Sequence, residues 1–335
     1  MLTITQLRKF EGGQWRSDTL DVLPDKITEG SILWVDAEDP SEEEITQLAS
    51  YFKIEKFELK DLSGDARRSK IEENEDSLSC FVRFPNRDQF TKDSKRDWIT
   101  LTAGKKWILS VHKGPSAITC EIYKKISTHG YFALSLVPST DILLYIFLDL
   151  VTSECFIVSD MVHEKLQVLS QEAANLFRQR PTQSNSNIGV RVARSRDQAL
   201  AFRQLIGPLR EVVGKIARGE FAIVSSATLP RFEDLYDRTI SLIEVADTHR
   251  EEIHDIGDIL INFQTVTTNN IISVLTIISA IFLPLTLIAG IYGTNFGHGY
   301  FTPGSNSIYG FYAMIVLMFA IAVGLITVFR RKGWL

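Results

Sequence analysis

Apolar and polar positions divide this chain sharply along its length. After Asp258 no Asp, Glu, Lys or Arg occurs until Arg330, and within that stretch residues 271–292 and 308–329 are mostly apolar. Each run has about the 20 residues that a helix needs to cross a bilayer. Because the two runs follow one another, the pattern favours a membrane hairpin over a pair of buried core helices.

Charges at the end of the second run indicate an orientation. Arg330, Arg331 and Lys332 follow it directly, and basic residues next to a span are typical of the cytoplasmic side. Because two spans cross the membrane twice, the region before the first span lies on the same side as these basic residues, the cytoplasmic side. We therefore expect a multi-pass protein of the cell (inner) membrane with both termini cytoplasmic and with membrane lipid as a partner. The net charge of −5 argues against a nucleic-acid partner.

The cysteines and the first residues agree with a cytoplasmic region. Cys80, Cys120 and Cys155 are scattered and form no paired motif, which suits a reducing compartment. The first fifteen residues lack the apolar core of a signal peptide.

The first part of the region before the hairpin has an α/β pattern. Ser41 and Glu44 form a capping-box pattern that opens a helix ending near Phe52. Gly104-Lys105-Lys106 is a predicted hairpin turn. The apolar runs predict strands at 32–35, 78–84 and 107–112 and a further helix at 118–127.

From Ser139 onward the pattern changes to long helices. We expect helices over 139–180 and 190–218, joined by a polar loop at 181–187, and a third helix over 231–292 that Leu229-Pro230 opens. At 1.5 Å per residue the third helix is on the order of 90 Å long. A helix of this length is typical of a stalk or a coiled coil.

The expected domains follow from these elements. They are a cytoplasmic α/β domain (1–228), a stalk helix (229–270), a first span (271–292), an extracytoplasmic loop (293–307), a second span (308–329) and a basic cytoplasmic tail (330–335).

One face of the first span mixes small, hydroxyl and apolar side chains without charge. On an ideal helix these positions fall within a stripe of about 80°. Such a stripe suits a pore with hydroxyl-lined steps and hydrophobic constrictions, although a helix-packing face has a similar composition. A hairpin alone cannot enclose water, so a pore needs several copies. The stripe begins at Thr265. Its positions from the next turn onward, which we call the pore stripe, are Thr268, Ile272, Leu275, Ser279, Leu283, Thr286 and Gly290.

The first span ends in Tyr292-Gly293-Thr294-Asn295-Phe296. Gly293 is a natural helix terminator, and Asn295 supplies a neutral amide oxygen. A ring of such oxygens would accept hydrogen bonds from the waters around Mg²⁺, an ion that dehydrates reluctantly. An ordinary Gly-Asn turn explains the same residues, so this motif alone leaves both interpretations open.

The motif resembles the Tyr-Gly-Met-Asn-Phe signature of the CorA magnesium/cobalt channel family. The apolar run from Leu275 to Tyr292 resembles that family's first span nearly throughout, and Lys332-Gly-Trp-Leu335 resembles its usual ending. Arg231-Phe-Glu-Asp-Leu-Tyr-Asp-Arg238 is similar to the family's stalk segment. The likeness extends over essentially the whole chain.

The resemblance implies a homopentameric channel with long stalk helices. Its cytoplasmic domain would be of the α+β class, with α/β/α layers that form a funnel. It assigns ion selectivity to Gly293, Thr294 and Asn295 and pore lining to the pore stripe. It implies that Mg²⁺ is both transported and regulatory, with Asp234 as a regulatory metal ligand between subunits, and it implies no organic cofactor. The expected function is passive influx of hydrated Mg²⁺, and also of Co²⁺ and Ni²⁺, gated by intracellular divalent cation.

Two departures from the family pattern keep other functions open. Thr294 stands where methionine is usual, and the loop at 297–306 lacks the acidic residues that the family often carries there. Zinc-transporting relatives of the ZntB branch also vary the middle residue, and His298 is a candidate soft ligand. A membrane-anchored coiled-coil scaffold that conducts nothing is the other alternative.

Enzyme motifs are not convincing in this sequence. Gly207 to Lys215 has six residues between its glycines where a phosphate loop has four, and Ile216 follows where that loop has Ser or Thr. His249 and His254 are five positions apart and point about 140° away from one another around a helix, so they do not form a metal-binding pair. We therefore expect no enzyme.

Overall fold

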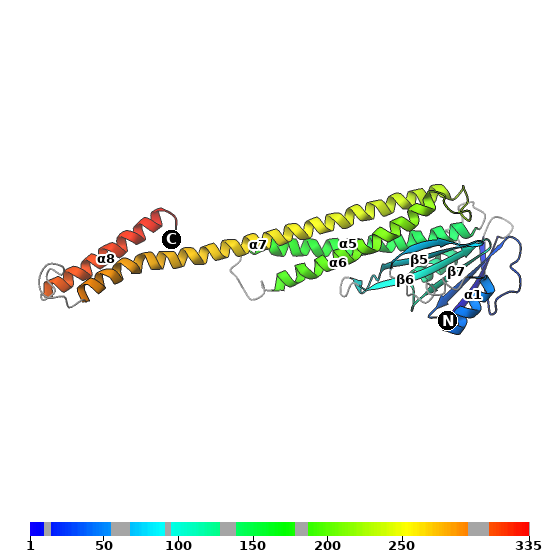
Figure 1. The fold of residues 1–335 in the computed structure, drawn as a ribbon, viewed down its shortest axis with the longest axis horizontal. Helices are drawn as coiled ribbons and strands as arrows, with labels where there is room; N and C mark the ends of the chain where they lie inside the picture. The colour runs from blue at the N-terminus through cyan, green and yellow to red at the C-terminus, as the bar shows by residue number, and fades with distance from the viewer. Residues whose placement is uncertain are drawn as a thin grey trace. The chain divides into compact units, whose positions relative to one another are not determined.

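The computed structural model describes residues 1–9, 15–54, 68–90, 95–127, 139–177, 187–293 and 308–334. These residues form two compact units, Met1–Gly257 and Asp258–Leu335. The first unit contains a mixed sheet with helices, and the second contains apolar helical segments (Figure 1). The expected α+β class with a long stalk helix and two C-terminal apolar helices is confirmed.

Within the described residues, seven strands form one sheet in the order β2-β1-β3-β7-β6-β5-β4. Neighbouring strands are antiparallel except β3 and β7, which are parallel. The strands are β1 (Leu2–Lys9), β2 (Trp15–Leu20), β3 (Ser31–Glu38), β4 (Lys70–Glu73), β5 (Ser77–Pro85), β6 (Arg96–Gly104) and β7 (Trp107–His112). The three predicted strands are β3, β5 and β7, whereas β1, β2, β4 and β6 were not predicted.

The hairpin between β6 and β7 has the predicted turn, with Lys105 and Lys106 as its two connecting residues. Gly104 is needed there because the Trp107 indole lies against it. A Cβ atom at position 104 would lie 2.3 Å from the Trp107 Cε2 atom, closer than any side chain tolerates. The glycine thus allows the indole to fold back over the turn.

One face of the sheet is covered by α1 (Glu42–Phe52). The predicted capping box opens this helix: the Glu44 backbone N–H donates to Ser41 Oγ at 3.2 Å, and the Ser41 N–H donates to Glu44 Oε2 at 2.8 Å. Leu48 and Phe52 of α1 pack into a buried apolar cluster with Leu33 and Val35 of β3.

The other face is covered by α4 (Ala117–Ser127) and α5 (Thr140–Asn175). Trp34 of β3 stacks on Tyr123 of α4 at 4.3 Å between ring centroids and meets Phe147 of α5 edge-on at 5.6 Å. Because successive side chains of a strand point to opposite faces, Trp34 lies on the face away from α1. Helices on both faces give the expected α/β/α layers.

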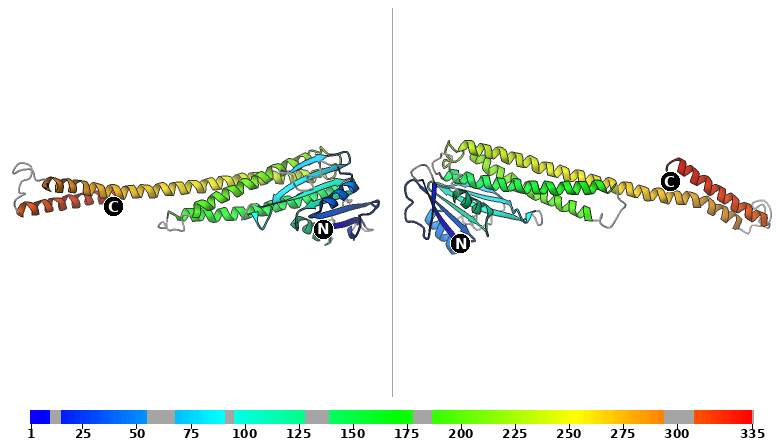
Figure 2. Two further views of the ribbon diagram at one scale, coloured as in Figure 1. Left: turned by 60° about the horizontal axis from the view of Figure 1, so that its bottom comes forward. Right: turned by 180° about the vertical axis from the view of Figure 1, so that it is seen from behind.

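The remaining helices are α6 (Ile188–Ala217), α7 (Leu229–Gly293) and α8 (Ile308–Arg331). Figures 1 and 2 show that α5, α6 and the first part of α7 lie side by side in the first unit. The predicted 231–292 helix is confirmed as the 65-residue α7, which continues into the second unit. The predicted loop at 181–187 lies outside the described residues except for Asn187.

Candidate ion pathway

Among the described residues, three helices are long and apolar enough to cross a membrane, but their environments differ. In α5, 67% of the most apolar window is buried within the protein, so a packed core explains its composition. In α7 only 6% of the corresponding window is buried, and in α8 none is. Apolar surface that no protein covers is typical of membrane helices, which selects α7 and α8 as the spans.

The pore stripe is exposed at every position in the single chain. Its large apolar members are 54% exposed at Ile272, 62% at Leu275 and 69% at Leu283. The chain thus presents the predicted stripe as a continuous uncovered face of α7. Other molecules, whether lipid, water or further copies of the chain, must cover it.

The opposite face of α7 is the better covered one. Ile277 is only 6% exposed, and Ser273, Pro284 and Ile288 are half-buried around it. On an ideal helix this face lies roughly 150° from the pore stripe. Figures 1 and 2 show α8 folding back beside the end of α7. The half-buried positions of α8 recur every three or four residues at Met314, Met318, Ile321, Leu325 and Phe329. The hairpin therefore packs through faces other than the pore stripe.

A hydroxyl on the pore stripe is oriented by the helix backbone. The Thr286 hydroxyl donates its proton to the Phe282 carbonyl oxygen at 2.8 Å. A threonine that donates to the preceding turn keeps only acceptor capacity toward its surroundings. Thr286 therefore presents an acceptor, which matches the outward-pointing hydrogens of water molecules bound to a cation.

The predicted selectivity residues are only partly described. Gly293 is the last residue of α7, as its role of helix terminator predicted, and a Cβ atom there would meet nothing within 4 Å. Thr294 and Asn295 lie outside the described residues, as does His298. Their arrangement around an ion stays a prediction.

The end of α8 is folded back on itself. Gly333 adopts a positive φ of 71°, and the Trp334 N–H then donates to the Phe329 carbonyl at 3.0 Å. The Trp334 indole stacks on the Phe329 ring at 5.9 Å between centroids. Arg330 and Arg331 in the last turn of α8 are exposed beside this aromatic pair. An indole next to basic residues is typical of a membrane–water interface.

Asp234, the predicted regulatory ligand, is exposed on α7 next to the buried Phe232 and Leu235. Within the described part of one chain, no group of three His, Cys, Asp or Glu side chains is arranged to hold a metal ion. Among these residues, Asp234 therefore belongs to no such group within a single chain, and its role as a ligand between subunits stays a prediction.

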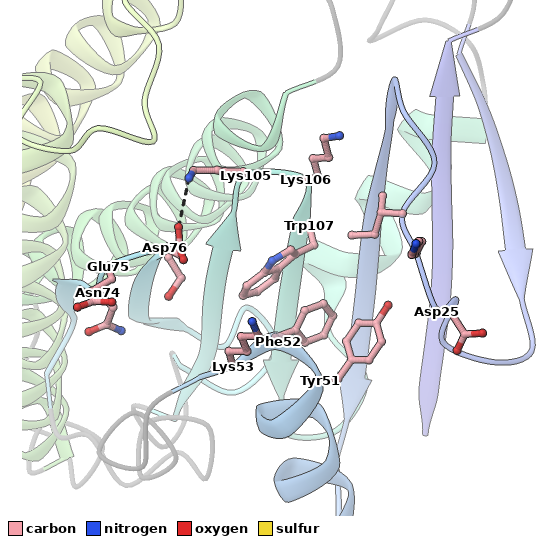
Figure 3. Close-up of a pocket in the computed structure, with 13 residues that line it drawn as sticks. Asp25, Tyr51, Phe52, Lys53, Asn74, Glu75, Asp76, Lys105, Lys106 and Trp107 are labelled. Atoms are coloured by element: carbon pink, nitrogen blue, oxygen red, sulfur yellow. Dashed lines mark hydrogen bonds and ion pairs between the residues drawn. The ribbon is translucent and has the colours of Figure 1, made fainter.

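The cavity in Figure 3, of about 890 Å³, lies at the end of α1 and contains no predicted site residue. Phe52 and Trp107 stack in it at 4.2 Å between ring centroids, and Lys105 pairs with Asp76 at 3.2 Å. Its lining carries both signs of charge, with Lys26, Lys53, Lys105 and Lys106 against Asp25, Glu75 and Asp76. Such a balance favours no particular ligand.

The comparison with protein families decides the identity of this fold. Residues 29–331 match the model of the CorA-like Mg²⁺ transporter protein family. The chain belongs to the CorA-like Mg²⁺ transporter family. It is thus a divalent metal transporter, not an enzyme, and an integral membrane protein whose spans are α7 and α8.

Individual relatives agree with this CorA assignment. The cobalt/magnesium transport protein CorA of Thermotoga maritima is 25% identical over 334 residues, which cover 99% of this chain and 90% of the relative. The complete structure of the CorA magnesium transporter from Methanocaldococcus jannaschii is 22% identical with a TM-score of 0.82, covering 99% of this chain and 98% of that one. A zinc transport protein ZntB of Pectobacterium carotovorum is 22% identical over 140 residues, 42% of each protein.

Proposed function

We propose that this CorA-family chain assembles as a homopentamer and conducts hydrated Mg²⁺, and also Co²⁺ and Ni²⁺, passively into the cell. The observation that carries the proposal is the pore stripe, which is exposed in the chain on a face of α7 away from the buried Ile277. A ring of copies would turn this face inward. The family resemblance and the name of the Thermotoga relative support Mg²⁺ and Co²⁺ as the ions.

Hydrated ions suit the chemistry of the stripe. Mg²⁺ keeps its waters because dehydration is costly, and those waters point their hydrogens outward. Thr286, whose own proton is donated to the Phe282 carbonyl, accepts such hydrogens. Between the hydroxyl positions, Leu275 and Leu283 would form apolar constrictions that close by expelling water.

The outer mouth would be formed by Gly293, Thr294 and Asn295 of each copy. Neutral amide and carbonyl oxygens bind the hydration shell weakly enough for the ion to move on. No energy source beyond the membrane potential is required. One charge crossing 100 mV gains about 2.3 kcal/mol, so a divalent ion gains roughly twice that.

Gating would follow the intracellular ion. When Mg²⁺ is plentiful it would bridge Asp234 of one copy to a carboxylate of the next and hold the ring closed. Without the ion, repulsion between the carboxylates would favour a looser ring, because the ion stabilises only the closed state. Asp234 is exposed on the surface of the chain, as an intersubunit ligand must be.

The proposal is tested by Mg²⁺ uptake into liposomes that contain the purified protein. Asn295→Ala should lower uptake or admit monovalent ions, while Asn175→Ala, an exposed asparagine at the end of α5, should leave uptake unchanged. Unchanged uptake and selectivity in Asn295→Ala would overturn the role of the motif. The complete absence of flux of any ion in the wild-type protein would favour the non-conducting scaffold.

A second candidate function is Zn²⁺ transport. The ZntB relative covers 42% of this chain, and Thr294 departs from the usual methionine of the CorA signature. A panel of Mg²⁺, Co²⁺, Ni²⁺ and Zn²⁺ fluxes, each with and without a pH gradient, separates the two. Zn²⁺ flux that depends on the gradient, with little Mg²⁺ flux, would replace the Mg²⁺ proposal.

A further inference from the structure

Two histidines stack between α5 and α7 in the first unit. The rings of His163 and His249 lie 5.9 Å apart between centroids with an angle of 19° between their planes. His163 comes from α5 and His249 from the part of α7 that packs beside it (Figure 1). Neither residue belongs to the predicted selectivity or pore-lining positions.

His249 is buried without a hydrogen-bond partner. Its side chain is 1% exposed, and neither ring nitrogen has a partner among the described residues. Buried polar groups are nearly always hydrogen-bonded, so an imidazole left in this state indicates a function other than packing. Histidine is also the side chain whose charge changes between about pH 5 and pH 8.

The surroundings favour the neutral form of His249. Burial and the nearby His163 lower its pKa, and only Asp160 acts in the opposite direction. On the partly exposed side, His163 Nδ1 lies 3.5 Å from Glu252 Oε2, and its Nε2 lies 2.9 Å from Gln167 Nε2. His163 thus places its ring nitrogens near Glu252 and Gln167, while its ring face lies against the buried imidazole of His249.

Other charged side chains of α5 and α7 close in sequence to the two histidines form contacts with α6. Arg203 of α6 pairs with Asp247 of α7 at 2.6 Å, and Lys165 of α5 donates to Gln198 of α6 at 3.0 Å. Asp160 and Glu252 are thus the acids that face the pair. Neither acid bonds to the buried nitrogens of His249, and the opposing effect of Asp160 is smaller than the effects of burial and of His163.

We propose that His249, stacked on His163, acts as a proton-operated latch between α5 and α7, closed while its buried imidazole is neutral and released when that imidazole is protonated. The sign follows from linkage. A histidine whose pKa is lowered in the packed state stabilises that state fully above its ordinary pKa of about 6.5. The stabilisation is lost as the pH falls below that value, because the open arrangement binds the proton more tightly. Cytoplasmic acidification would therefore loosen α5 from the stalk.

The test is hydrogen–deuterium exchange of the full-length protein in lipid discs, compared between about pH 7.5 and about pH 5.5, across the range where histidine titrates. After correction for intrinsic rates, wild-type peptides around His163 and His249 should exchange faster at the lower pH. The excess should be about tenfold for each unit by which the pKa values of packed and open states differ. Peptides of the sheet should not show this excess.

Three variants make the result specific. His249→Phe keeps a ring but cannot titrate, so it should abolish the excess exchange, while His254→Gln, at an exposed histidine of the same helix, should retain it. His249→Gln, which also cannot titrate, should abolish the excess as well, and it decides the question if the phenylalanine variant does not fold. A wild-type protein without excess exchange, or an excess that survives both variants, would overturn the latch. The exchange experiment does not measure ion flux, so its result does not depend on whether the proposed transport function is correct.

Discussion

Asp36 and His112 face each other across the parallel strands β3 and β7, with His112 Nε2 3.3 Å from Asp36 Oδ1. Both side chains are nearly inaccessible to solvent. The Ser110 hydroxyl donates to the same carboxylate, and the Trp34 indole N–H donates to Ser110 at 2.9 Å. The pair therefore belongs to a polar network inside the sheet, where an unpaired member would be costly.

This network predicts a pH-dependent stability. Burial lowers the pKa of His112, but the hydrogen bond and charge of Asp36 outweigh it and raise the pKa above its ordinary value. The stabilisation is therefore complete below about pH 6.5 and is lost as the pH rises through the raised pKa.

Thermal unfolding of the wild-type protein from about pH 6 to pH 9 should show this loss, whereas Asp36→Asn should remove that part of the pH dependence. A hydrogen bond to a charged group contributes about 1.5–3 kcal/mol, which bounds the effect. Identical pH profiles for the two proteins would refute the assignment.

Arg238→Ala should destabilise the first unit by about 3 kcal/mol. The Arg238 guanidinium pairs with Asp149 of α5 and donates to Ser153 Oγ at 3.2 Å. The Asp149 side chain is only 10% exposed, so removing the guanidinium takes away the charge that pairs with a buried carboxylate, and breaking such a pair costs about 3–5 kcal/mol. We expect the lower end of this range because Arg238 itself is 35% exposed and solvent weakens its interaction with Asp149.

The matched control for this change is Arg203→Ala. Its ion pair with Asp247 joins side chains that are 49% and 42% exposed, and pairs of this kind contribute about 1 kcal/mol at most. Chemical denaturation of both variants measures the difference. Equal losses would show that burial of Asp149 does not control the strength of the Arg238 pair.

Gly214→Ala should destabilise the packing of α6 on α7. A Cβ atom at this position would lie 2.8 Å from Tyr236 Cε2 of α7, so the ring must move. Overpacking of this kind costs about 1–3 kcal/mol. At Gly189, in the first turn of α6, a Cβ atom meets nothing within 4 Å, so Gly189→Ala should change the stability little. A neutral Gly214→Ala would show that Tyr236 relaxes freely.

Cysteine accessibility tests which face of α7 lines the proposed pore. In a Cys120→Ser background, Ser279→Cys on the pore stripe should make Mg²⁺ flux sensitive to water-soluble thiol reagents. Ile277→Cys, on the covered face, should not. Native Cys80 and Cys155 do not interfere, since both are buried and burial raises the pKa of each thiol. Inhibition through position 277 alone would place the pore on the other face.

Local patterns predicted the elements whose chemistry is local. The capping box at Ser41 and Glu44 set the start of α1, and the two-residue turn after Gly104 set the β6–β7 hairpin. Among the strands that were not predicted, β1 mixes apolar and polar residues and β4 has a single apolar residue, Ile71. They are strands because their neighbours in the sheet supply hydrogen bonds, and the identity of those neighbours is not written in the segment itself.

In the candidate site, too, features set by local spacing were predicted, and contacts between distant residues were not. The pore stripe was predicted from helical spacing, because a long uninterrupted helix has a known angular repeat. The stacking of His163 on His249 was not predicted, since the two residues lie 86 positions apart (249 − 163) and no local pattern connects them. Sequence spacing excluded a metal pair between His249 and His254 but gave no sign of the partner on α5.

By itself, the sequence determined that a long helix ends in a charge-free span, that a second such span follows it, and that the first span ends in the Gly293 to Asn295 motif. It did so because the bilayer thickness and the rise per residue of a helix together fix how many apolar residues a span needs. Only the tertiary structure decided that the apolar α5 is a core helix and not a third span, because burial depends on what packs against it. It also decided which face of α7 stays uncovered, and this face carries the predicted pore stripe.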